Sequence, residues 1–204
     1  QARENLTLNK RPKLVVPEIH RAHRPFIFPL IGKTLQYLSG WEVEGTVPNI
    51  NKVVVVCAPH TSNWDFIFGM ILMLSVDIKV NFLAKKSIFV PVFNIILNKL
   101  GGIPVDRNNP ELLVEQMARF TKNNKGVILA VTPEGTRKKV TRWKTGFLRI
   151  AQSAQCKVLP LGIDYPSKTF NFGKLFHPTG NNEKDVIALK MSLKDYKGRH
   201  PERH

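Results

Sequence analysis

A continuous run of β-branched residues, KVVVVC at residues 52–57, constrains the fold more than any other stretch of the sequence. Short runs of this kind are typical of strands that are buried on both faces of a sheet. Pro59 ends the run, and the apolar segment at residues 66–75 is interpreted as a buried helix. Ser62 and Asp65 have the spacing of a capping box at the start of that helix. A buried strand, a polar turn and a buried helix together indicate an α/β fold.

The same alternation continues along the chain. We expect strands at residues 79–83, 103–105, 127–131 and 158–163, and helices at residues 88–99, 111–122 and 145–154. The C-terminal part departs from the alternation, with a strand expected at residues 169–175 and a charged helix at residues 183–194. The predicted fold is a single α/β domain whose mostly parallel sheet is covered by helices.

Residues 1–45 are predicted to form an N-terminal amphipathic segment, and residues 46–204 the main domain. The stretch PFIFPLIGKTLQYLSGW places Ile27, Ile31, Leu35 and Leu38 on one helical stripe. Such a helix either lies in a membrane interface or caps the core, and both alternatives stay open. No apolar run reaches the roughly 18–20 residues of a spanning helix, so the chain is not expected to cross a bilayer. It begins at Gln1 rather than Met, so a preceding anchor also stays open.

The chain is strongly basic, with 31 Lys and Arg against 15 Asp and Glu and a formal net charge of +16. Such a surface attracts polyanions, whether nucleic acid, anionic lipid or phosphorylated substrates. The basic residues are spread along the whole sequence without a nucleic-acid-binding signature. A membrane surface or a phosphate ligand is therefore favoured over nucleic acid.

The residues that commonly bind metals or form disulfides give little signal. Cys57 and Cys156 fit reduced, buried thiols better than a disulfide framework. No cluster has the spacing of a metal site, so no metal is expected. The histidines other than His60 are expected at the surface or in the tail: His20, His23, His177, His200 and His204.

His60 and Asp65 lie between the predicted strand and helix, and two interpretations of them compete. In the first, Asp65 caps the helix and His60 is an ordinary loop residue. In the second, His60 is a general base whose imidazole is oriented by Asp65. Ligand sites in open α/β sheets lie beyond the carboxyl ends of strands, where this pair is expected. Taken alone, the pair favours the first interpretation, because a His followed five positions later by an Asp is common by chance.

Three further stretches follow HTSNWD in order: GGIPVDR at residues 101–107, PEGTR at residues 133–137 and VLPL at residues 158–161. Together they resemble the glycerolipid acyltransferase family, whose best-known members are the lysophosphatidic acid acyltransferases. That family is marked by H-x-x-x-x-D, G-x-[IV]-x-[VI]-x-R and E-G-T-R blocks and by a late apolar block containing proline. The matching region, about residues 52–163, covers more than half of the chain.

The resemblance implies that His60 and Asp65 are the catalytic pair. His60 would take a proton from an acceptor hydroxyl as the oxygen attacks an acyl thioester, without a covalent enzyme intermediate. Neither cysteine lies in a setting that would activate it as a nucleophile. The resemblance also implies a substrate-binding set: Lys85, Arg107, Glu134, Gly135, Thr136, Arg137, Lys144 and Pro160. Within this set, Arg107 and Arg137 are expected to hold a phosphate through their guanidinium groups.

The expected function is acyl transfer from acyl-CoA or acyl carrier protein to the hydroxyl of a lysophospholipid, with lysophosphatidic acid as the favoured acceptor. No cofactor is expected beyond the thioester co-substrate. The donors are cytosolic and the acceptor lies in a bilayer, so a peripheral or monotopic protein is expected on the cytoplasmic face of the cell membrane, drawn to anionic headgroups and to an acidic carrier protein. A non-catalytic membrane- or polyanion-binding protein and a thioesterase of the same fold remain as alternatives.

Overall fold

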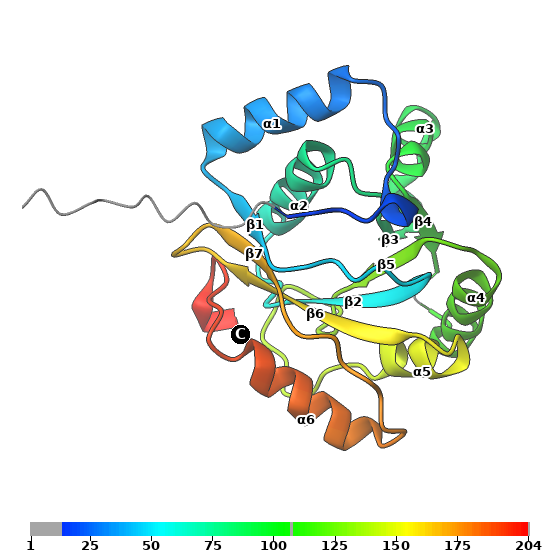
Figure 1. Ribbon diagram of the computed structural model, residues 1–204. Helices are drawn as coiled ribbons and strands as arrows, with labels where there is room; N and C mark the ends of the chain where they lie inside the picture. Colours follow the sequence, from blue (N-terminus) through cyan, green and yellow to red (C-terminus); the bar gives the residue numbers. More distant parts are fainter. Residues whose placement is uncertain (1–13, 107, 204) are drawn as a thin grey trace, which may run out of the picture.

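The computed structural model describes residues 14–106 and 108–203 (Figure 1). The first 13 residues, Arg107 and His204 lie outside these ranges. The predicted phosphate contact of Arg107 therefore stays a prediction, as does the division of the chain at residue 45.

Seven strands form one sheet in the order β1-β7-β6-β2-β5-β3-β4. Their bounds are β1 Glu42–Glu44, β2 Lys52–Ala58, β3 Asn81–Lys85, β4 Gly102–Val105, β5 Val127–Val131, β6 Lys157–Asp164 and β7 Thr169–Phe172. Neighbouring strands run parallel except β6 and β7, which are antiparallel. The predicted α/β fold with a mostly parallel sheet is confirmed.

Helices cover both faces of the sheet: α1 Ile27–Ser39, α2 Trp64–Ser75 and α3 Pro91–Lys99 on one face, and α4 Pro110–Asn123, α5 Gly146–Ser153 and α6 Asn182–Leu193 on the other (Figure 1). Successive strand residues point to opposite faces, so the valine run of β2 serves both layers. Val54 and Val56 pack in the cluster that includes Leu148 of α5. Val53 and Val55 pack in the cluster that includes Leu72 of α2. The run is therefore buried on both sides, as expected of a central parallel strand.

Most predicted bounds differ from the observed ones by one or two residues, and three elements differ more substantially. The predicted helix at residues 88–99 is divided into a 3₁₀ turn, Lys86–Ile88, and α3, which begins at Pro91. Proline disfavours helical backbone in the residue before it and is itself well suited to the first helical position, so the helix starts there. The predicted strand at residues 79–83 lies two residues later, as β3. The predicted strand at residues 169–175 ends sooner, at Phe172.

Helix α1 packs against α2, and the two helices approach each other very closely at Gly32. Gly32 is the one buried residue of α1, and a Cβ at that position would lie 2.4 Å from the backbone nitrogen of Ser75. The predicted stripe of Ile27, Ile31, Leu35 and Leu38 remains exposed. The stripe itself therefore does not pack into the core, although the helix rests on α2, and membrane association of this helix stays a prediction. Among the residues that the structure describes, no helix is both long enough and apolar enough to cross a membrane.

His20 contradicts the expectation that it lies at the surface. Its side chain is fully buried in the 3₁₀ turn Glu18–His20, with Nδ1 3.4 Å from the carbonyl oxygen of Gly126. The turn packs against the loop that leads into β5, because a Cβ at Gly126 would lie 2.4 Å from the carbonyl oxygen of Ile19. The segment before α1 thus contributes to the core, which the sequence pattern did not indicate.

Candidate active site

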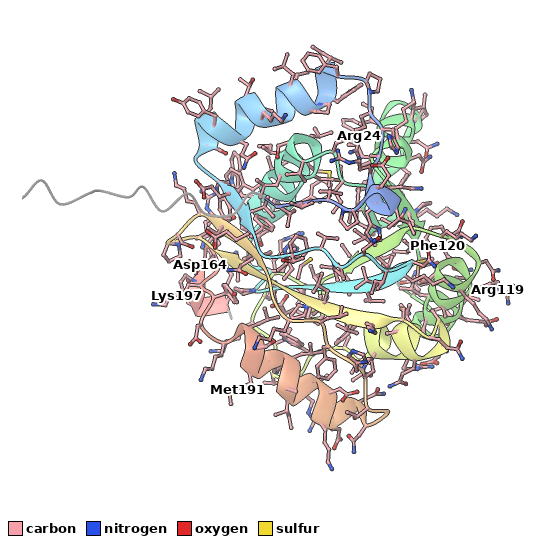
Figure 2. All side chains as sticks on the ribbon, in the orientation of Figure 1. Arg24, Arg119, Phe120, Asp164, Met191 and Lys197 are labelled. Atoms are coloured by element: carbon pink, nitrogen blue, oxygen red, sulfur yellow. The ribbon has the colours of Figure 1, made fainter. Side chains whose placement is uncertain are left out.

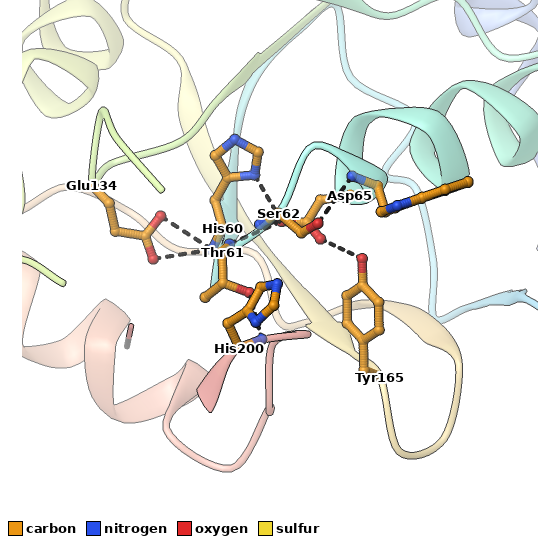
Figure 3. A network of polar contacts seen from close by, with 8 residues as sticks. His60, Thr61, Ser62, Asp65, Glu134, Tyr165 and His200 are labelled. Carbon is orange, nitrogen blue, oxygen red and sulfur yellow. Dashed lines mark hydrogen bonds and ion pairs between the residues drawn. The ribbon is translucent and has the colours of Figure 1, made fainter. Parts of the chain in front are cut away.

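His60 and Asp65 lie beside each other at the carboxyl end of β2 (Figure 3). The imidazole Nδ1 of His60 is 2.9 Å from Oδ2 of Asp65. His60 follows β2 by two residues, and Asp65 is in the first turn of α2. The strand-turn-helix unit therefore folds the carboxylate back onto the imidazole. Because an ionised carboxylate only accepts hydrogen bonds, Nδ1 donates and Nε2 carries the lone pair.

The Asp65 carboxylate is buried and fully engaged. Its Oδ2 also accepts the backbone N–H groups of Thr61 at 2.9 Å and Ser62 at 3.0 Å, and its Oδ1 accepts the hydroxyl of Tyr165 at 2.6 Å. Burial alone would raise the pKa of Asp65, but the hydrogen bonds from His60, Tyr165 and Ser62 outweigh it, so the pKa lies below its usual value. The carboxylate is therefore ionised at neutral pH and held in one orientation.

The predicted capping box is present in a modified form. Asp65 accepts the backbone N–H of Ser62, and the hydroxyl of Ser62 accepts the backbone N–H of Trp64 at 3.2 Å. The N-cap residue of α2 is Asn63, which makes no side-chain capping hydrogen bond. Asp65 therefore holds the turn that precedes the helix and orients the imidazole with the same carboxylate.

Glu134 holds the backbone of His60. Both of its carboxylate oxygens lie 3.2 Å from the backbone nitrogen of His60, and the side chain is 6% exposed. It comes from the loop after β5, the strand next to β2. The sequence predicted a substrate-binding role for Glu134, which stays a prediction, and the structure shows that this side chain also supports the residue that carries the imidazole.

The other residues of the PEGTR stretch form a tight turn beside Glu134. Gly135 has a left-handed backbone with φ of 65°. The side chain of Lys144 crosses over it, so that a Cβ there would lie 2.9 Å from Cε of Lys144. Thr136 accepts the backbone N–H of Lys138 through its hydroxyl at 3.3 Å, and Arg137 is exposed. A glycine is needed here both for the backbone angle and for the close approach of the lysine.

Two further predicted residues lie at different positions along the strands, one at a strand end and one inside a strand. Lys85 is the last residue of β3 and is exposed at the carboxyl edge, two strands from β2. Pro160 lies within β6, opposite Val56 of β2, and is buried. Its ring lies close to Gly173, where a Cβ would be 2.9 Å from Cγ of the proline. Pro160 is thus part of the sheet and is not at the edge where His60 lies.

Sequence reasoning missed the support that reaches the dyad from the C-terminal third of the chain. Tyr165 follows β6 directly, and its position beyond a strand end was the one available signal. The backbone N–H of His200 donates to the hydroxyl of Thr61 at 3.2 Å (Figure 3). The guanidinium group of Arg199 lies 5.4 Å from the centre of the Trp64 ring. These partners are 100 or more residues away in sequence, so no local pattern reveals them.

The thiols are poorly suited to nucleophilic chemistry. Burial, followed by the charges of Glu134 and Asp65, raises the pKa of Cys57 to about 12. Burial likewise raises the pKa of Cys156 to about 11. Both are free cysteines, and both are overwhelmingly protonated at neutral pH. Within the described parts of the chain, no group of three or more His, Cys, Asp or Glu residues is arranged to hold a metal ion.

Comparisons with known proteins agree on one family. A family model described as "Acyltransferase" matches residues 41–164. The 1-acyl-sn-glycerol-3-phosphate acyltransferase of Pseudomonas aeruginosa is 30% identical over 128 residues, covering 59% of this chain and 48% of that protein. The chain thus spans about half the length of this curated relative.

A solved structure shares the fold. The crystal structure of the 1-acyl-sn-glycerophosphate (LPA) acyltransferase PlsC from Thermotoga maritima matches with a TM-score of 0.58 and 21% identity. The match covers 85% of this chain and 80% of that one. The order of the strands and helices around His60 therefore belongs to an arrangement already seen in a crystal.

Proposed function

Since the chain belongs to the acyltransferase family, we propose that it moves a fatty acyl group from a thioester donor to the hydroxyl of lysophosphatidic acid, which gives phosphatidic acid. Acyl-CoA and acyl carrier protein are the two donors to be tested, and no cofactor takes part. The names of the Pseudomonas relative and of the Thermotoga structure support a 1-acylglycerol phosphate as acceptor.

The observation that carries the proposal is the contact of 2.9 Å between His60 Nδ1 and Asp65 Oδ2. With Nδ1 donating to Asp65, Nε2 of His60 accepts the proton of the acceptor hydroxyl. The hydroxyl oxygen forms a bond to the acyl carbonyl carbon, and the carbon–sulfur bond breaks. The proton on the imidazolium then passes to the leaving thiolate. Buried and ionised, Asp65 stabilises the imidazolium while it exists.

The basic residues of the carboxyl edge supply the proposed site for the acceptor phosphate. Adjacent strands lie about 4.8 Å apart, so the loop after β5 is one strand from His60 and Lys85 of β3 is roughly 10 Å away across the sheet. The phosphate of the acceptor is only a few bonds from the attacking hydroxyl. Arg137 and Lys144, which follow β5, are therefore the proposed primary phosphate contacts, with Lys85 farther out.

We also propose that the protein docks on the cytoplasmic face of the cell membrane through helices α1, α2 and α3. Exposed apolar side chains gather on these helices: Phe26, Ile27, Leu30, Ile31, Leu38, Trp64, Phe66, Ile67, Phe93, Ile95 and Ile96. Trp64 and Phe66 flank Asp65 in the sequence, so this apolar surface begins beside the dyad. An extensive apolar surface around a site for a lipid acceptor suits docking on a bilayer. The net charge of +16 favours anionic headgroups.

The acyl transfer is tested by following thiol release from acyl-CoA and from acyl carrier protein, with a panel of lysolipids as acceptors. Wild-type protein is expected to release thiol only with lysolipid present and fastest with lysophosphatidic acid. His60→Ala is expected to abolish release. His177→Ala is the matched control, because His177 is exposed and follows Phe176, which bridges to Val158 near the amino end of β6. Release without lysolipid would indicate a thioesterase, and turnover unchanged in His60→Ala would overturn the proposal.

Membrane docking is tested separately by flotation with vesicles of phosphatidylcholine alone or mixed with phosphatidylglycerol. The triple variant Ile27→Ser, Ile31→Ser and Leu38→Ser changes exposed residues of α1 and is expected to lose binding to both compositions. The control variant Ile187→Ser and Met191→Ser changes exposed residues of α6, on the opposite layer (Figure 2), and is expected to float like wild type. Equal flotation of both variants would overturn docking through α1.

A further inference from the structure

Tyr165 is joined to the dyad by a short hydrogen bond that no motif of the sequence includes. It follows β6 directly, and its hydroxyl donates to Oδ1 of Asp65 at 2.6 Å (Figure 3). His60, Thr61 and Ser62 all donate to the other oxygen, Oδ2. Among the residues that the structure describes, Tyr165 is thus the only hydrogen-bond donor to Oδ1. Without its hydroxyl, that oxygen would lose the contact that fixes it.

A carboxylate held at one oxygen by three donors and at the other by a fourth has no freedom to rotate about its Cβ–Cγ bond. Its two oxygens are then not interchangeable: Oδ2 is committed to the imidazole and Oδ1 to the phenol. A hydrogen bond to a buried charged group is also stronger than one between neutral groups. We therefore infer that Tyr165 is a positioning residue, which fixes the Asp65 carboxylate so that the imidazole of His60 is held in a single orientation. The inference rests on the proposed acyl transfer for its kinetic consequence.

The tyrosine is itself held from several sides. Its backbone N–H donates to the carbonyl of Lys197 at 2.9 Å, and the backbone N–H of Lys197 donates to Oδ1 of Asp164 at 2.9 Å (Figure 2). Its ring lies edge-on to Trp41, with centroids 4.8 Å apart, and 6.3 Å from Phe68 of α2. The hydroxyl of Tyr165 therefore has little freedom to move, because the backbone is hydrogen-bonded to Lys197 and the ring packs among aromatic side chains. Such rigid support is what a positioning contact requires.

The electrostatic setting agrees with this role. Burial, followed by the hydrogen bond to Asp65, raises the pKa of Tyr165 well above its usual value, so the phenol remains a donor throughout the working pH range. The same hydrogen bond contributes to the lowered pKa of Asp65. If it is removed, Asp65 becomes more basic.

The variant Tyr165→Phe tests the inference, because it removes one oxygen and keeps the ring among Trp41 and Phe68. We expect kcat to fall about tenfold, in line with a lost hydrogen bond to a charged group, while KM for both substrates stays unchanged. The acidic limb of the pH profile of kcat/KM is expected to move to higher pH. A more basic Asp65 binds the shared proton more strongly, so the His60–Asp65 pair loses that proton only at a higher pH. The matched control is Tyr196→Phe. Tyr196 packs on Gly162 at the same end of β6, and within the described part of the chain its side chain makes no hydrogen bond to His60 or Asp65.

A double-mutant cycle separates positioning from a general structural effect. In a His60→Ala background, Tyr165→Phe is expected to cause no further loss of residual activity, because its effect passes through the imidazole. A measurement that needs no turnover is the proton resonance of the His60 Nδ1–H, assigned by its disappearance in His60→Ala. This resonance is expected to shift in Tyr165→Phe and to stay in place in Tyr196→Phe.

The positioning role would be overturned by a resonance that is identical in wild type and Tyr165→Phe. It would also be overturned by a kinetic loss that appears in KM alone. A kinetic loss that persists in full in the His60→Ala background would overturn it as well. Because the resonance is independent of substrate, it decides the matter even if wild-type protein transfers no acyl group. That outcome would remove the proposed function and leave the contact of Tyr165 with the dyad standing.

Discussion

Both carboxylate oxygens of Glu134 lie 3.2 Å from the backbone nitrogen of His60, so the loop after β5 holds the residue that projects from the end of β2. Two neighbouring strands thus define one site: β2 supplies the imidazole and β5 supplies the anchor of its backbone. Ligand sites in such sheets generally lie beyond the carboxyl ends of parallel strands. Here the loops that follow β2 and β5 are joined at that edge by the hydrogen bond between His60 and Glu134.

Truncating Glu134 is expected to impair activity by displacing His60. Glu134→Ala leaves the backbone N–H of His60 without this acceptor in a buried setting, and a loss of about 1–3 kcal/mol corresponds to a fall of roughly 5- to 150-fold in kcat/KM. Glu134→Gln keeps one acceptor oxygen and is expected to lose less. Steady-state kinetics of both variants check this. Equal activity of Glu134→Ala and wild type would show that the contact does not position the imidazole.

The Asp65 carboxylate is expected to make stability depend on pH. Its folded-state pKa lies below the usual 3.8, so the ionised group stabilises the fold fully at pH values above 3.8. That contribution declines as the pH falls below 3.8 and is lost once the pH passes the folded-state pKa. Asp65→Asn is therefore expected to be less stable than wild type at pH 7, with the gap narrowing toward pH 3. Urea unfolding at constant ionic strength measures it, and a gap independent of pH would contradict the lowered pKa.

Cys57 is expected to be dispensable for acyl transfer. Its pKa of about 12 leaves almost no thiolate at neutral pH, although it lies only three residues before His60. Cys57→Ala is expected to retain most of the wild-type kcat. Neither Cys57 nor Cys156 is expected to react with Ellman's reagent in the native protein, whereas both react after unfolding in urea. Loss of turnover in Cys57→Ala with an unchanged melting temperature would instead indicate a thioester intermediate.

The contact between α1 and α2 is expected to depend on the glycine at position 32. Gly32→Ala places a Cβ 2.4 Å from the backbone of Ser75, so the helices must separate, and overpacking of this kind costs about 1–3 kcal/mol of unfolding free energy. Gly69→Ala is the matched control in α2. Its Cβ would meet Phe170 at an ordinary 3.8 Å, so the change is expected to be neutral or stabilising by up to about 1 kcal/mol. Urea unfolding of both variants checks the difference, and equal stability would show that α1 does not rest on this contact.

Sequence patterns predicted the helices and strands whose positions are determined by neighbouring residues, and they missed features that depend on distant ones. The strand at residues 127–131 was found with the same bounds, because a short apolar run between polar residues leaves little ambiguity. The short strand β1 was missed, since the three residues of EVE carry no period and are held by pairing with β7, more than 120 residues away. His20 was missed for the same reason: its burial depends on a contact with Gly126.

The candidate site divides in the same way. The assignment of His60 and Asp65 as a catalytic pair depends on the four ordered blocks that resemble the glycerolipid acyltransferases, because the spacing of the two residues fits a helix cap equally well. The contact of Glu134 with the backbone of His60 could not be predicted, because it depends on β5 lying next to β2. The contact of Tyr165 could not be predicted either, since its position beyond a strand end is the one local signal and nothing in GIDYPSK indicates a partner 100 residues earlier.

The hydrogen bonds that join Tyr165 to Asp65 of α2 and His200 to Thr61 of the preceding loop span 100 and 139 residues of sequence. Contacts between residues so far apart in the sequence form late in folding. Bringing the two residues together costs chain entropy before their contact stabilises the fold. During refolding from urea, the helical signal is therefore expected to recover before turnover does. Turnover would report arrival at the native topology, while circular dichroism would report only the earlier formation of helices.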